Sequence, residues 1–114
     1  MAYFLIFGEG WGERCIMVHM KVLGIIWLHS IIDKLDWKHH LIPQEVEQVF
    51  ANKPQYRLLE RGKIEGEDVY AAYGRTDQGR YITVVFIRKA GGKALVISAR
   101  DMDRKERKQY GRKS

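Results

Sequence analysis

The chain has 114 residues, 46% hydrophobic and 30% charged, which fits one globular domain and excludes a disordered chain. Its formal net charge of +6 suits a polyanionic partner such as RNA, DNA, an acidic membrane surface or an acidic protein, and equally a basic protein that binds none of these. The single cysteine, Cys15, excludes an internal disulfide and a thiolate metal cage, and favours a reducing, cytoplasmic location.

The first 19 residues differ from the rest of the chain. They are rich in glycine around Trp11 and show no clear hydrophobic period, and Met20 has the character of a natural start. We therefore expect 1–19 to be an extension outside the core and 20–114 to form a single domain. The apolar run Val22–Leu28 has no small-residue cleavage site and is far shorter than a membrane span, so we predict a buried strand or helix start and no membrane partner.

Two short helices are predicted next. From Ile31 to His40 apolar residues recur on one helical face, and this helix should end before Pro43, because the residue that precedes a proline avoids helical geometry. Pro43 suits the first turn of a second helix, which Pro54 follows. The apolar stripe of the second helix is Val46, Val49 and Phe50.

After Pro54 the hydrophobic pattern alternates, as is typical of strands. The predicted strands are Tyr56–Glu60, Asp68–Gly74, Arg80–Arg88 and Ala94–Ser98. Short turns join them, which favours an antiparallel meander. Asp103 and Glu106 have capping-box spacing at the start of a last helix that runs to about Tyr110. The expected fold class is α+β, with two short N-terminal helices, a four-stranded antiparallel meander and a C-terminal helix, and with the helices on one face of the sheet.

Several kinds of site are absent from the sequence. His39 and His40 are adjacent, so on a helix their rings point about 100° apart and do not readily share one metal ion. No glycine-rich loop joins a strand to a helix, and there is no Gly-x-Ser-x-Gly nucleophile motif. We therefore expect neither a metal nor another cofactor.

Cations, histidines, a tyrosine and a carboxylate lie near the ends of the predicted elements. They are Lys38, His39, His40, Arg75, Arg80, Arg88, Arg100, Glu106, Arg107 and Tyr110. A metal-free ribonuclease needs such groups to move protons and to stabilise the charge on a pentacoordinate phosphate. Each also has a structural interpretation: a solvated helix face for Lys38 and Arg107, a sheet margin for Arg80 and Arg88, and a helix cap for Glu106.

Seven short motifs follow one another in a specific order between Lys38 and Tyr110. They are Lys38-His39-His40, Pro43-Gln44-Glu45-Val46-Glu47, Gly74-Arg75-Thr76, Gly79-Arg80-Tyr81, Val84-Val85-Phe86, Ser98-Ala99-Arg100 and Glu106-Arg107-Lys108-Gln109-Tyr110. In order and spacing they resemble the BrnT family of toxins. The stretch before Lys38 departs from the family pattern, with Trp37 after Asp36 and no asparagine in the first helix, which indicates a divergent branch.

The resemblance implies a RelE-like ribonuclease that cleaves RNA without a metal, inhibits translation and is neutralised by a BrnA-type antitoxin in a hetero-oligomer. The catalytic residues carried over are His39, His40, Arg100, Glu106 and Tyr110. The residues carried over for RNA phosphate are Lys38, Arg75, Arg80 and Arg107. The alternative is a module on the same scaffold that binds RNA or pairs with the antitoxin without catalysis.

Overall fold

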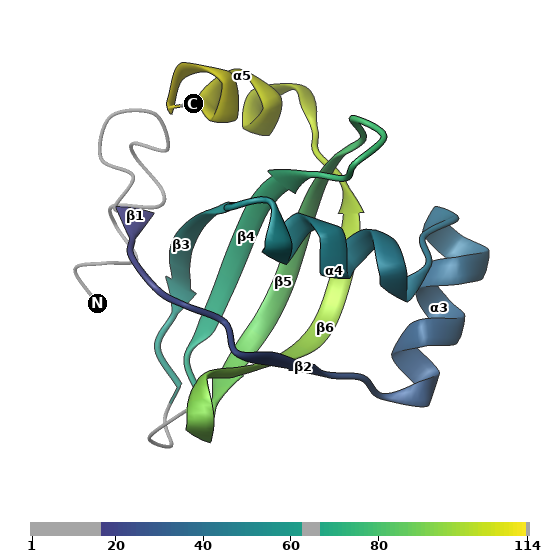
Figure 1. Cartoon of the computed structure of the whole chain (residues 1–114), viewed down its shortest axis with the longest axis vertical. Coiled ribbons are helices and arrows are strands. Elements are labelled where there is room, and N and C mark those ends of the chain that lie inside the picture. The colour runs from purple at the N-terminus through teal and green to yellow at the C-terminus, as the bar shows by residue number, and fades with distance from the viewer. Residues whose placement is uncertain (1–16, 63–66, 114) are drawn as a thin grey trace.

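The structure is a computed structural model and describes residues 17–62 and 67–113. A curved six-stranded sheet is flanked by helices (Figure 1). The strands are β1 (Met17–Val18), β2 (Gly24–Ile26), β3 (Gln55–Glu60), β4 (Val69–Arg75), β5 (Tyr81–Lys89) and β6 (Lys93–Asp101). The helices are α3 (His29–His39), α4 (Pro43–Ala51) and α5 (Arg104–Lys113), and a 3-10 turn, η1, spans Ala90–Gly92.

The sheet has the order β1-β3-β4-β5-β6-β2. Its centre is an antiparallel meander of β3 to β6, as the alternating pattern predicts. The prediction of four antiparallel strands is incomplete, because β1 pairs antiparallel with β3 and β2 pairs parallel with β6. The sheet is therefore mixed, and each of its edges carries an additional strand of only two or three residues, too short to show a hydrophobic period.

The N-terminal part of the described chain crosses the face of the sheet from one edge to the other (Figure 1). Met17 and Val18 pair with β3, and Val18 packs against the core. Of the extension expected at 1–19, Met17 and Val18 therefore belong to the sheet, whereas 1–16 lie outside the described residues. The run Val22–Leu28 contains β2, but it is only half-buried, since Leu23 is 69% exposed at the sheet edge.

The sheet has an apolar core on each of its faces. On one face, β5 places Ile82, Val84 and Phe86 against the buried residues of α3 and α4. On the opposite face, Tyr81 packs with a smaller cluster that includes Tyr110 of α5. The expectation that all helices cover one face is therefore wrong for α5, because β5 is apolar on both sides and each side needs a cover.

Local hydrogen bonds mark the end of α3 and the start of α5. His40 has a φ of 55° and ends α3, and its N–H donates to the carbonyl oxygen of Asp36. In the predicted capping box of α5, the Asp103 N–H donates to Glu106 (3.0 Å) and the Glu106 N–H donates to Asp103 (2.7 Å). Helix α5 continues past the predicted end at Tyr110 to Lys113. None of the helices in the described ranges is long and apolar enough to cross a membrane.

Candidate functional site

The predicted site residues fall into two groups. The first lies on the sheet face under α5, and we call it the α5 face. Its members are Arg75, Tyr81, Thr83, Arg100, Glu106, Arg107 and Tyr110. The second lies where α3 meets α4 and the end of β6, and we call it the α3–α4 corner. Its members are Lys38, His39, His40, Glu45, Arg80 and Asp101.

The centre of the α5 face is the ring of Tyr81, which two arginines flank. The guanidinium carbon of Arg107 lies 4.1 Å from the ring centroid, and that of Arg75 lies 5.6 Å from it. Tyr110 meets the same ring edge-to-face, with centroids 5.8 Å apart. Cation–π contacts hold both guanidinium groups without neutralising them. Within 17–62 and 67–113 neither arginine side chain has a carboxylate partner, so both keep donors for an anion.

Beside this stack, Arg100 and Glu106 form a two-pronged ion pair. Both of its N–H···O distances are 2.8 Å, and the Thr83 hydroxyl donates to the same carboxylate at 3.0 Å. The Glu106 side chain is 12% exposed and that of Arg100 is 40% exposed. Burial raises the pKa of Glu106, but the hydrogen bonds from Arg100, Asp103 and Thr83 outweigh it and hold this pKa below its ordinary value. At neutral pH Glu106 is therefore an ionised acceptor whose oxygens are already occupied.

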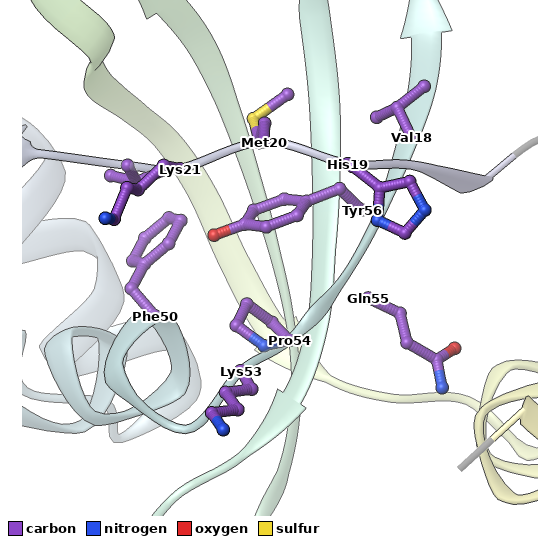
Figure 2. Close-up of a pocket in the computed structure, with 10 residues that line it drawn as sticks. Val18, His19, Met20, Lys21, Phe50, Lys53, Pro54, Gln55 and Tyr56 are labelled. Carbon is purple, nitrogen blue, oxygen red and sulfur yellow. The ribbon is translucent and has the colours of Figure 1, made fainter.

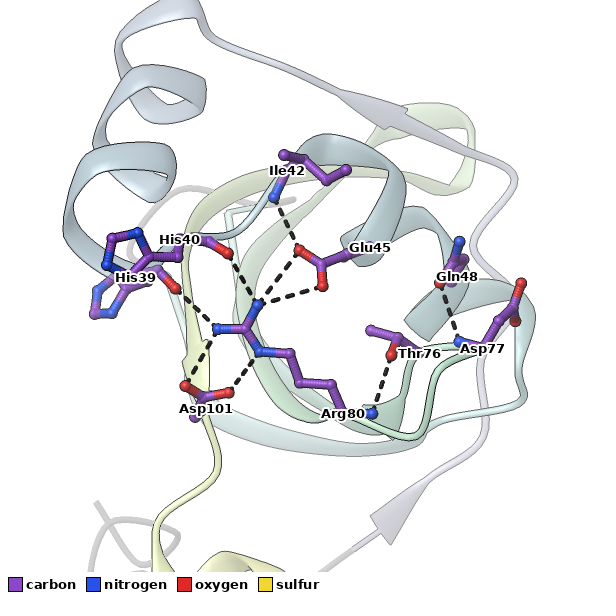
Figure 3. Close-up of polar contacts among 9 residues, drawn as sticks. All are labelled: His39, His40, Ile42, Glu45, Gln48, Thr76, Asp77, Arg80 and Asp101. Atoms are coloured by element: carbon purple, nitrogen blue, oxygen red, sulfur yellow. Dashed lines mark hydrogen bonds and ion pairs between the residues drawn. The ribbon is translucent and has the colours of Figure 1, made fainter.

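At the α3–α4 corner, Arg80 joins three segments of the chain (Figure 3). Its Nε donates to Asp101 at 2.8 Å, and its terminal nitrogens donate to the carbonyl oxygens of His39 and His40, each at 2.9 Å. The remaining N–H groups donate to Glu45 and to the second oxygen of Asp101. An arginine has five N–H donors, and all five of Arg80 are bound within the protein.

The charges at this corner reinforce one another. The hydrogen bond from Arg80 lowers the pKa of Asp101 below its ordinary value, and the charge of His39 adds to this shift. The hydrogen bond to Asp101 in turn raises the pKa of Arg80. Figure 3 shows the rings of His39 and His40 pointing away from Arg80, so their backbone oxygens, and not their rings, contact it.

The structure thus brings five of the nine predicted site residues to one face. They are Arg75, Arg100, Glu106, Arg107 and Tyr110. The other four, Lys38, His39, His40 and Arg80, belong to the corner. The two groups adjoin at Asp101, because Arg100 donates to its backbone oxygen (3.1 Å) while Arg80 binds its side chain.

One cavity shares residues with the α5 face, whereas none of the residues that line a second cavity belongs to either group. A pocket of about 400 Å³ is lined by Asn52, Arg75, Thr76, Asp77, Gly79 and Tyr110. A larger one of about 500 Å³ lies between residues 18–22 and the start of β3, and Phe50 and Tyr56 contribute its rings (Figure 2). Burial raises the pKa of Tyr56 to about 12. Phe50 and Tyr56 each also pack edge-to-face with Phe86 of the core.

Three residues of the candidate site were not predicted from the sequence, namely Tyr81 and Thr83 of β5 and the turn residue Asp77. Tyr81 and Thr83 alternate with the core residues of β5, so their parity already placed them together on the opposite face. Arg75 pairs with Tyr81 across β4 and β5, a register that a sequence does not reveal. In the parts of the chain that the structure describes, no three His, Cys, Asp or Glu side chains are grouped to hold a metal ion.

Comparison with known proteins identifies the family of this chain. The family model described as "Ribonuclease toxin, BrnT, of type II toxin-antitoxin system" matches residues 33–106. The chain belongs to the BrnT family. The BrnT match runs from α3 to Glu106, so Arg107 and Tyr110 lie just beyond it. Membership of this type II toxin–antitoxin family implies an antitoxin partner.

A solved BrnT structure supports the fold. The crystal structure of the Brucella abortus ribonuclease toxin BrnT matches with a TM-score of 0.50 and 20% identity, over 75% of this chain and 100% of that one. At this identity the match shows the shared α+β fold and not the site. No curated protein matches the sequence.

Proposed function

We propose that this BrnT protein is a metal-independent endoribonuclease that cleaves RNA by attack of a 2′-hydroxyl on the neighbouring phosphate and thereby inhibits translation. The observation that carries the proposal is the stack of Arg75, Tyr81 and Arg107 on the α5 face. Two guanidinium groups held over one ring, without carboxylate partners in the described chain, match the need for donors to an RNA phosphate.

The arginines supply charge stabilisation in this scheme. The 2′-oxygen gives up its proton and bonds to phosphorus, and the bond from phosphorus to the 5′-oxygen breaks as that oxygen leaves and takes up a proton. Negative charge builds up on the phosphate oxygens during this step, and fixed guanidinium donors stabilise it in the transition state. Arg75 and Arg107 bind the phosphate, whereas Arg100 lies on the same face but is paired with Glu106 through two hydrogen bonds. Arg80 has no donor left for RNA, so we assign it the role of holding the α3–α4 corner together.

The proton steps have two candidate groups. Glu106 is on the α5 face and is ionised, so it can accept a proton, although Arg100 and Thr83 compete for its oxygens. The histidines lie at the corner, which adjoins this face at Asp101. If Glu106 is the base, its lowered pKa keeps RNA cleavage active into acidic solution. The pH dependence of RNA cleavage therefore tests Glu106 as the base.

The test is induced expression together with cleavage of RNA by the purified protein in EDTA. We expect growth arrest and RNA cleavage, both reduced by more than tenfold in Arg75→Ala/Arg107→Ala. His39→Ala/His40→Ala and Arg100→Ala, each measured separately, identify which of the remaining residues act. A harmless protein that leaves RNA intact would overturn the proposal.

A second candidate function has its own support. Because Arg100 and Glu106 are paired with each other and the histidines lie apart, the same face suits binding of RNA, or of the antitoxin, without catalysis. RNA binding without cleavage would favour it. In either case we propose a cytoplasmic protein that forms a hetero-oligomer with a BrnA-like antitoxin, which co-purification of the neighbouring gene product tests.

A further inference from the structure

The pocket of about 400 Å³ shares two of its walls with the α5 face. Arg75 and Tyr110 belong both to the pocket and to the group around Tyr81. Whatever fills the pocket therefore lies beside the cations to which we assign the RNA phosphate. In RNA, the group beside a phosphate is a nucleotide's sugar and base, and single-stranded bases are read by hydrogen bonds to their edges.

The floor of the pocket is a fixed turn. The Asn52 side-chain amide donates to the backbone oxygen of Arg75 at 2.9 Å and to Oδ1 of Asp77 at 3.0 Å. The Asp77 N–H donates to the Gln48 side chain at 3.0 Å, as Figure 3 shows. Gly79, with a φ of +90°, lets the chain turn here. The carboxylate of Asp77 is thus anchored through its neighbours and points away from the Arg80 contacts.

The pocket offers two acceptors and a cationic donor. Both N–H bonds of the Asn52 amide are directed to protein acceptors, which leaves Oδ1 of Asn52 for a ligand. Within the described ranges, Oδ2 of Asp77 has no hydrogen-bond partner. Arg75 supplies the donor. Because the Asp77 carboxylate repels a phosphate, the sugar–phosphate backbone should avoid this pocket and a base should enter it.

We propose that this pocket binds a guanine base of the RNA and that Asp77 is its specificity-determining residue. Guanine presents an N–H and an NH₂ side by side, which a carboxylate accepts together, and beside them a carbonyl oxygen to which Arg75 donates. Adenine and cytosine present one amino group on this edge, and uracil presents one N–H. The inference rests on the proposed ribonuclease function, because that function brings RNA to the α5 face.

The first test measures binding of mononucleotides to the full chain by calorimetry or NMR titration. We expect 3′-GMP to bind at least tenfold more tightly than 3′-AMP, 3′-CMP or 3′-UMP. Asp77→Asn keeps the oxygen that Asn52 binds but replaces the other with an NH₂ group, so it should remove this preference at an unchanged melting temperature. Gln78→Ala is the matched control in the same turn, and it should keep the preference.

The second test uses short RNA substrates with a single guanine, or with inosine in its place. Inosine lacks the amino group, so wild type should cleave it about tenfold more slowly, whereas Asp77→Asn should cleave both at similar rates. Equal binding of the four nucleotides, or an Asp77→Asn protein that still prefers guanine, would overturn the proposal. If wild type binds 3′-GMP selectively but cleaves no RNA, the ribonuclease function fails and the guanine site stands.

Discussion

Two regions of this molecule use the same side chain in opposite ways. At the α3–α4 corner, every donor of Arg80 is bound by Asp101, Glu45 and two backbone oxygens. On the α5 face, Arg75 and Arg107 lie against an aromatic ring that takes none of their donors. The sequence places all three in family motifs, but the structure separates an arginine that holds the fold from two that remain open to a ligand. What an arginine does is decided by what its N–H groups already bind.

The largest expected effect comes from removing the bound arginine. Arg80→Ala leaves two carbonyl oxygens and two carboxylates without their donor, so we expect the free energy of unfolding to fall by about 2–3 kcal/mol, a figure already reduced because Asp101 is 63% exposed. Urea unfolding at neutral pH measures this loss.

The matched control is Arg88→Ala on the same strand. Arg88 lies an even number of residues from Arg80, on the same side of the alternating pattern, but it is exposed. Its loss should therefore change the free energy of unfolding by no more than about 0.5 kcal/mol. If Arg80→Ala were as stable as wild type and only lost RNA affinity, Arg80 would be a phosphate ligand and the comparison between the two regions would fail.

The second largest effect is expected on RNA affinity, when an arginine beside Tyr81 is removed. Arg107→Ala should weaken binding to single-stranded RNA about tenfold and reduce the slope of log affinity against log salt by about one. Stability should stay within about 0.5 kcal/mol, because only the contact with Tyr81 is lost. Fluorescence anisotropy at several salt concentrations measures both quantities.

Arg104→Ala provides the control on the same helix, since Arg104 is exposed and, within 17–62 and 67–113, makes no cation–π contact with Tyr81. We expect it to weaken RNA binding less than Arg107→Ala does. If the two variants lost the same amount of RNA affinity, RNA binding would depend on the total charge of α5. The contact of Arg107 with Tyr81 would then have no special role.

Much of the fold follows from local patterns. The spacing of apolar residues within a few positions predicts the two helices that contain Leu35 and Val46, and it also predicts the meander. The spacing of Asp103 and Glu106 likewise predicts the cap of α5. The pairing of the two edge strands was not predictable, because the partners of β1 and β2 lie far away in sequence. The apolar run Val22–Leu28 predicted a strand or helix start where β2 lies, but not its place at the sheet edge.

The sequence predicted candidate site residues but not how the structure groups them. Charge and motif selected Arg75, Arg80 and Arg107, yet only the register of β4 and β5 places Arg75 beside Tyr81. Likewise, no spacing rule brings Asp101 to Arg80 across 21 residues. Pairings of this kind depend on tertiary structure, so sequence reasoning gathered the corner and the α5 face into one site that the structure divides in two.

The smallest expected effect is on the pH dependence of stability, to which the ionised Glu106 carboxylate contributes. A carboxyl group whose pKa is lowered by folding contributes stability above its unfolded pKa of about 4, and that contribution is lost as the pH falls through the lower, folded value. Glu106→Gln should therefore cost about 1 kcal/mol at pH 7 and progressively less in acid, as urea unfolding from pH 7 downward measures. Glu47→Gln, at an exposed position of α4, should keep the wild-type pH dependence.

The same variant tests whether Arg100 belongs with the bound or the open arginines. Loss of the Glu106 charge leaves the Arg100 guanidinium without its neutralising partner, so RNA affinity should rise by about two- to threefold at low salt. A fall in affinity would mean that RNA needs Arg100 held in place by Glu106, and that this pair belongs with the fixed contacts of the corner. A rise in RNA affinity would place Arg100 with Arg75 and Arg107, as an arginine of the α5 face that binds RNA phosphate when Glu106 does not neutralise it.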